Sequence, residues 1–234
     1  MSGERTRLAG GTAGAGSARL RLSGDEAADE VISRNPFALL VAMVLDQQIP
    51  LEWAFTGPKL LTDRLGAELD PGRVASLAEE RLVEVFSQRP ALHRFPGSMA
   101  RRVHELAQRL VSEYGGDAAA VWTDAESGPE LFRRLRKLPG FGDQKARIFI
   151  ALLGKQLGIR PPGWDQVAGP YAEAGSLRSI ADITGPETLA AVREHKRAMK
   201  LAAAGAGGGE KAATAKKAAT AKKAATAKKA APRR

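Results

Sequence analysis

A nine-residue stretch, LPGFGDQKA at 138–146, places two glycines directly before an apolar segment. Gly140 and Gly142 have no side chain to keep a bulky group away, and glycine adopts positive φ without strain. A helix that begins just after them would add its own free N–H groups and the positive end of its dipole. The pattern therefore predicts a site in which backbone N–H groups hold a phosphate. Such a contact is independent of base sequence when the phosphate belongs to a nucleic acid.

The apolar residues of the same stretch have a separate task. Leu138 and Phe141 are predicted to anchor the turn in the core, and Pro139 completes the motif. A tight connection between two helices with no ligand would use the same residues. The stretch by itself leaves both interpretations open.

The elements that would position this turn are helices. Apolar periodicity and capping patterns predict helices at 36–48, 103–114, 131–135, 146–154 and 186–203, and a capping box formed by Ser76 and Glu79 predicts a further helix that ends near Phe86. The segment at 36–48, PFALLVAMVLDQQ, is apolar around nearly its whole circumference and should be buried. Only residues 18–22 resemble a strand. The sequence predicts an all-α domain at 19–203, preceded by a disordered segment at 1–18.

Composition excludes several classes of site. The chain has no cysteine, so it has no disulfide, no cysteine-based zinc site and no thiolate-bound iron–sulfur cluster. Its three histidines show no spacing typical of metal ligands, and we expect neither a metal nor another cofactor. No apolar run is long enough to span a membrane, and residues 1–18 lack the apolar region of a secretion signal. These features are compatible with a cytoplasmic protein that is monomeric.

Basic charge is concentrated at the C-terminus. The net charge is +10, and residues 205–234 hold seven Lys and two Arg against one Glu, which leaves about +2 for the other 204 residues. AATAKK occurs three times in succession, and six residues rotate a helix by about 240°, so no apolar face forms. We predict a flexible tail at 204–234 that binds DNA nonspecifically, although a solubilising role or binding to RNA or anionic membrane fits the same composition. The cations in question are Lys216, Lys217, Lys222, Lys223, Lys228, Lys229, Arg233 and Arg234.

Helix, LPGxG and buried helix in this order resemble the helix-hairpin-helix element of the HhH-GPD superfamily of DNA glycosylases. NPFALLVAMVLDQQ is similar to the first core helix of that family, and MARRVHELAQRLVSEYGGD to the helix that leads to the hairpin. The resemblance covers about residues 30–170. It implies a helix-hairpin-helix glycosylase fold and base excision from double-stranded DNA. Because the chain has no cysteine, it would lack the iron–sulfur cluster of some family members.

The resemblance implies roles for three positions near the hairpin. Asp165 follows the hairpin as the family's essential aspartate does, where a carboxylate can stabilise the cationic sugar of the transition state or activate a water. It would alternatively cap the following helix near Val167. Bifunctional members carry a Schiff-base lysine two residues after the second hairpin glycine, where this chain has Gln144. Lys145 comes one residue later, a rotation of about 100°, and is assigned to phosphate or solvent. We therefore predict a monofunctional glycosylase; a shift in register that returns Lys145 to the pocket is the alternative.

Gln47 and Gln48 end the first core helix, where family members use a glutamine to approach the gap left by the extruded base. Gln48 is the first candidate, although polar residues at an exposed helix end need no such role. Trp164 could line the base pocket or simply pack. A protein that keeps the fold and binds DNA in the bacterial nucleoid without catalysis is the alternative to an enzyme. The sequence does not indicate which base would be removed.

Overall fold

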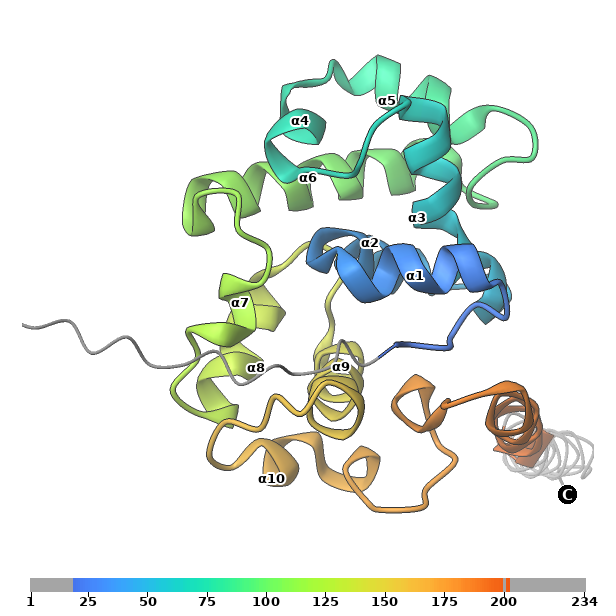
Figure 1. Cartoon of the computed structure of the whole chain (residues 1–234), viewed down its shortest axis with the longest axis vertical. Coiled ribbons are helices and arrows are strands. Elements are labelled where there is room, and N and C mark those ends of the chain that lie inside the picture. The colour runs from blue at the N-terminus through green and yellow to red at the C-terminus, as the bar shows by residue number, and fades with distance from the viewer. Residues whose placement is uncertain (1–18, 200, 203–234) are drawn as a thin grey trace, which may run out of the picture.

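The computed structural model describes residues 19–199, 201 and 202 (Figure 1). Helices make up this part of the chain and it contains no strand, which confirms the predicted all-α fold. Residues 1–18 and the basic tail, for which disorder is predicted, lie outside the described residues. The elements are α1 Glu26–Arg34, α2 Pro36–Leu45, α3 Leu51–Leu65, α4 Pro71–Ser76, α5 Glu79–Ser87, α6 Pro96–Tyr114, α7 Ala120–Thr123, α8 Gly128–Lys137, α9 Asp143–Gln156, α10 Trp164–Ala168, the 3₁₀ turns η1 Gly169–Tyr171 and η2 Ile180–Asp182, and a helix at 186–199.

The helices form two groups around α2. Figure 1 shows α4, α5 and α6 on one side of α1–α3, and α7–α10 on the other. α8 and α9 pack together as the two arms of the hairpin, with α10 against both. The helix at 186–199 follows η2 and lies at the edge of the second group. α2 therefore has neighbours on all sides.

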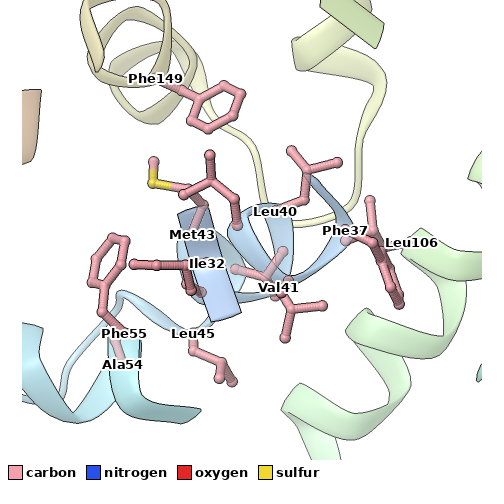
Figure 2. Packing of buried hydrophobic residues seen from close by; sticks show 14 of the residues in the cluster. Ile32, Phe37, Leu40, Val41, Met43, Leu45, Ala54, Phe55, Leu106 and Phe149 are labelled. Atoms are coloured by element: carbon pink, nitrogen blue, oxygen red, sulfur yellow. The ribbon is translucent and has the colours of Figure 1, made fainter. Parts of the chain in front are cut away.

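The apolar circumference of α2 explains its central place. Nine of its ten residues are buried, from Phe37 to Leu45. In Figure 2, Phe37 faces Leu106 of α6, and Met43 points toward Phe149 of α9. Full burial of each large apolar side chain contributes about 1.5–3 kcal/mol, which far exceeds differences in helix propensity. The prediction that this helix is buried is confirmed.

Asn35 fixes the start of α2. Its side-chain oxygen accepts from the N–H of Ala38 at 3.0 Å, and its amide donates to the carbonyl of Leu69 at 2.7 Å. The cap therefore also ties α2 to the segment between α3 and α4. Since a cap contributes about 1 kcal/mol, most of the stability of α2 comes from packing.

The structure has a long helix, α3, that the sequence pattern does not predict. Gly57 and Pro58 stand inside it, and such residues normally weaken a helix. Close packing explains Gly57, because a Cβ there would lie 2.5 Å from Cδ1 of Leu45, and Pro58 is buried beside it. The predicted capping box at Ser76 is also wrong, since Ser76 ends α4 and α5 has Ala78 as its N-cap. Residues 19–22, part of the strand-like segment, have no partner strand.

Gly154 of α9 is a position where the packing allows a specific test. A Cβ there would lie 2.3 Å from the ring of Trp164. We expect Gly154→Ala to lower the free energy of unfolding by about 1–2 kcal/mol, even though alanine adds about 1 kcal/mol of helix propensity. Urea denaturation measures this change. Gly185→Ala is the matched control, because a Cβ on Gly185 meets nothing within 4 Å; equal stability of the two variants would contradict the packing.

Candidate functional site

The hairpin between α8 and α9 is anchored in the core. Leu138 and Phe141 are 2% and 5% exposed, as predicted, and the ring of Phe141 meets that of Phe149 edge-on at 5.8 Å. The N–H of Phe141 donates to the carbonyl of Leu138 at 3.1 Å and closes the turn. Pro139 lies within this turn, between the two α-helices. The hairpin is thus a rigid extension of the core.

The two hairpin glycines do different things. Gly140 has φ +83°, and a Cβ there would lie 2.9 Å from Cδ of Arg102, so both conformation and space require glycine. Gly142 has φ −84° and open space where a Cβ would be, so the positive φ considered for it does not occur. Gly142 instead is the N-cap of α9. Its role is access rather than backbone conformation.

The start of α9 offers free donors. The N–H groups of Gly142, Asp143 and Gln144 find no acceptor in the described part of the chain. They surround the positive end of a 14-residue helix, which is suited to an anion. Asp143 adds a negative charge there, and Arg136 of α8 forms an ion pair with it. The pair offsets that charge next to the free donors.

A cavity of about 500 Å³ opens beside the hairpin. The end of α2 forms one wall, the start of α9 another, and the segment from η1 to the helix at 186–199 closes it. It lies in the size range of small-ligand sites. Its lining residues are Met43, Asp46, Gln47, Gln48, Gln144, Lys145, Ile148, Pro170, Tyr171, Arg178, His195, Lys196 and Met199.

Lys145 is the most perturbed group in this cavity. Its side chain is half-buried, and its Nζ donates to the carbonyl of Met43 near the end of α2. The pKa of Lys145 is lowered from 10.5 to about 8: burial is the largest cause, the negative charge of Asp46 opposes it, and the positive charge of Arg102 adds to it. At pH 7 about one tenth of the amine is neutral, a far larger share than for an ordinary lysine. The amine is therefore not directed to solvent, whereas its contact with a phosphate stays a prediction.

Gln144 lies at the exposed rim of the cavity. Its Nε2 donates to the Tyr171 hydroxyl at 3.0 Å. One residue of helix rotation thus separates a rim position from an interior position, and the lysine takes the interior one. The alternative in which Lys145 returns to the pocket therefore describes this arrangement better than the interpretation in which the motif directs the lysine away from it.

The two glutamines after α2 differ in how they are held. Gln47 is fixed: its Nε2 donates to the carbonyl of Val44 at 2.6 Å, and its Oε1 accepts from Arg102 at 3.0 Å. Nε2 of His93 lies 2.8 Å from the Gln47 carbonyl, and burial lowers the pKa of His93. Gln48 is exposed, has φ +58° and makes no side-chain hydrogen bond to a described residue. Gln48 is thus held by its backbone, and its side chain is available.

The hairpin, the cavity and the buried amine agree with the comparison with known families. The family model described as "HhH-GPD superfamily base excision DNA repair protein" matches residues 41–223. The chain belongs to this family. It therefore acts in base excision DNA repair and binds DNA, and the members of this family are DNA glycosylases. Comparison with curated proteins and with solved structures gave no match.

For a helix-hairpin-helix protein, the position of Asp165 is unexpected. Its loop is attached where α8 starts, since the N–H of Gly128 donates to the carbonyl of Pro162 at 2.8 Å. Trp164 packs on Gly154, near the end of α9. Both contacts lie at the ends of α8 and α9 that are remote from the hairpin, roughly 14 and 16 Å along the helices. Asp165 is exposed and does not line the cavity.

The expected placement of Asp165 and Trp164 is therefore wrong. The carboxylate does not face the hairpin's cavity, and the tryptophan packs between α9 and Arg160, whose guanidinium carbon lies 5.7 Å from the ring centre. The capping alternative for Asp165 also fails, because Gly163 is the N-cap of α10 and no side chain caps it. Residues that follow the hairpin in the same order as in the family therefore need not point their side chains toward the cavity.

The cavity also contains residues that the sequence analysis did not single out. Asp46 immediately precedes Gln47 and Gln48, so the sequence could have indicated that it lies near the same site. Tyr171, Arg178 and His195 come from segments far along the chain, and no local pattern marks them. Among the described residues, no group of His, Cys, Asp and Glu is arranged to hold a metal ion, and none of the helices there is apolar and long enough to cross a bilayer.

The amine of Lys145 can be titrated directly. We expect the pH dependence of its acetylation by acetic anhydride, followed by mass spectrometry, to give an apparent pKa of about 8 in the folded protein. The same lysine in urea-unfolded protein should titrate near 10.5, because unfolding removes the burial. Equal values in the two states would show that the amine is not in the cavity.

Proposed function

We propose that this chain is a DNA glycosylase that removes a damaged or mispaired base after the nucleotide is flipped out of double-stranded DNA. The hairpin N–H groups hold a phosphate of the strand, and the cavity receives the flipped nucleotide. The amine of Lys145 attacks C1′ of the deoxyribose. The observation that carries the proposal is the buried, partly neutral amine of Lys145 in the cavity beside the hairpin.

The spacing along α9 supports this arrangement. The free N–H groups at 142–144 directly precede Lys145, within one turn of the same helix. A phosphate at the helix start therefore brings its own sugar within reach of the lysine side chain. Because the phosphate contact is made by the backbone, it is independent of the base that is removed.

The nature of the nucleophile separates two versions of the enzyme. A neutral lysine that attacks C1′ forms a Schiff base and permits strand cleavage. In a monofunctional glycosylase, as predicted from the motif, water attacks instead. That prediction depended on a lysine directed away from the pocket, so the cavity-facing amine favours the bifunctional version.

Two exposed side chains are suited to the gap that a flipped nucleotide leaves. Gln48 extends from the turn after α2, and Phe95 is 45% exposed. His93 joins their two segments, because its Nδ1 accepts from the N–H of Phe95 at 3.0 Å while its Nε2 lies 2.8 Å from the carbonyl of Gln47, the residue before Gln48. We place both side chains at the duplex, next to the cavity. The phenyl ring would stack where a base has left.

A non-catalytic DNA-binding protein remains the second candidate. It is favoured by Asp165, which lies outside the cavity and so does not serve the role the family motif gives it. This protein would use the same hairpin without chemistry. The two candidates differ in one observable, base release.

Lys145 provides the test of the enzymatic proposal. We expect the purified protein to release a base from at least one member of a panel of duplexes with single damaged or mismatched bases. Sodium borohydride should trap a covalent adduct with DNA, and the rate of trapping should rise with pH with a midpoint near pH 8, where the amine is half neutral, and level off above it. Lys145→Gln should abolish the adduct, and Lys59→Gln is the control on a surface lysine.

The outcomes are distinct. Base release without an adduct would establish the monofunctional version, with water as nucleophile. Retention of the adduct in Lys145→Gln would exclude this lysine. Binding to every duplex with no base release from any would leave the non-catalytic protein.

The basic tail has a proposed role of its own. We infer that it adds nonspecific affinity for DNA, because a polycation releases counterions from the phosphates, and that the protein acts as a monomer on the bacterial nucleoid in the cytoplasm. The concentration of charge supports this: residues 205–234 hold +8 of the net +10. The remainder of the chain is close to neutral and depends on the hairpin for its contact.

Neutralising the tail tests this role. We expect replacement of the six repeat lysines (Lys216, Lys217, Lys222, Lys223, Lys228 and Lys229) by Gln to reduce the slope of log K against log salt by about 5. Fluorescence anisotropy over a salt series measures the slope. The single-turnover rate of base release at saturating protein should not change. An unchanged slope would contradict a DNA-binding tail.

A further inference from the structure

We propose that Asp46, and not Asp165, supplies the carboxylate of this active site and stabilises the cationic sugar as the base leaves. This inference rests on the proposed function and adds a catalytic residue to it. Asp46 follows the last residue of α2, and its N–H donates to the Ala42 carbonyl at 3.0 Å. Its backbone turns the chain there, with φ −69° and ψ 71°, and its side chain lines the cavity.

Asp46 is the single acidic residue among those that line the cavity in the described part of the chain. Its side chain is half-buried, and no described residue forms a hydrogen bond or an ion pair with its carboxylate. Other half-buried acids here are occupied; Glu130, for instance, binds Arg134 at 2.6 Å. An acid with no structural partner, inside a cavity, is available to a ligand.

The charges around Lys145 distinguish Asp46 from every other neighbour. The charge of Arg102 of α6 lowers the pKa of the amine, and His93 lies close enough for Lys145 to lower the pKa of the imidazole. Arg178, His195 and Lys196 line the cavity and are basic. Asp46 is the one charged group among these neighbours that raises the pKa of the amine, and both residues line the same cavity.

This pairing fits the chemistry of base removal. The bond between C1′ and the base nitrogen breaks, its electron pair leaves with the base, and the base takes a proton from solvent. Positive charge develops on the sugar, and a fixed carboxylate in a low-dielectric site stabilises it. The lone pair of Nζ then forms the new bond to C1′, and the resulting ammonium loses its proton to solvent. The two side chains act on the same carbon.

Asp165 cannot take this part in the observed arrangement. It is exposed, and its loop is attached at the ends of α8 and α9 opposite to the hairpin. A sugar whose phosphate is held at the start of α9 lies roughly 16 Å along that helix from this loop. The two aspartates are therefore a matched pair, of which one lies in the cavity and one outside it.

The first test compares Asp46→Asn with Asp165→Asn on a lesion that the wild-type protein excises. We expect Asp46→Asn to lower the single-turnover rate of base release about 10²–10³-fold, as for other groups that stabilise transition-state charge. Its affinity for a duplex with a tetrahydrofuran abasic-site analogue should stay within about threefold, since binding comes from the hairpin. Asp165→Asn should keep the wild-type rate within about twofold. A wild-type rate in Asp46→Asn, or the large loss in Asp165→Asn instead, overturns the proposal.

The second test does not need base release. Removal of the Asp46 charge leaves positive groups around the amine, so the apparent pKa of Lys145, measured by acetylation, should fall below the wild-type value in Asp46→Asn and stay the same in Asp165→Asn. An unchanged value in Asp46→Asn overturns the shared site. If the wild-type protein excises no lesion, both the glycosylase proposal and the catalytic role of Asp46 are contradicted. A lowered pKa of Lys145 in Asp46→Asn would in that case support only the proximity of the carboxylate and the amine.

Asp46→Asn should fold, because the lost carboxylate makes no hydrogen bond to a described residue. Thermal unfolding of the variant within about 2 °C of wild type verifies this. Asp46→Glu adds a further check: the longer carboxylate should restore part of the rate and of the amine pKa. A merely structural role for Asp46 would move the melting temperature and leave the pKa of Lys145 unchanged.

Discussion

The contact on which the site depends is that between the Lys145 ammonium and the C-terminal end of α2. The last carbonyls of a helix have no partner within it and carry the negative end of the dipole. Met43 offers such a carbonyl, and the amine of Lys145 donates to it. One hydrogen bond thus joins the start of the second hairpin helix to the end of the central core helix. It also holds the amine in a place where burial keeps its pKa near 8.

A second polar centre holds the far wall of the cavity. Lys155, near the end of α9, donates to the carbonyls of Tyr171 and Glu173 at 3.0 and 2.6 Å and pairs with the buried Asp182 at 2.5 Å. Asp182 also accepts from the N–H groups of Arg178 and Ser179. A buried ion pair whose remaining acceptors are satisfied adds little net stability, but it fixes one arrangement of the chain. Here it fixes the segment that carries Tyr171 and Arg178 to the cavity.

The two ends of α9 therefore have complementary tasks. Its start holds free N–H groups and the reactive amine, and its end organises the opposite wall. The apolar residues between them, from Phe149 to Leu153, are buried against the core and keep the helix in place. Rigid support of this kind is what a site needs if a strand and a nucleophile are to meet with little reorganisation.

The sequence by itself determined the helical class, the burial of α2, the anchoring of the hairpin by Leu138 and Phe141, and the family. These depend on local periodicity and on short-range turn chemistry, which the order of residues contains. Only the tertiary structure decided the directions of Asp165, Trp164 and Lys145. Each depends on where a neighbouring element lies: α8 fixes the loop of Asp165, Gly154 admits the ring of Trp164, and the end of α2 draws in Lys145. Such contacts join residues up to 102 positions apart, and no local pattern specifies them.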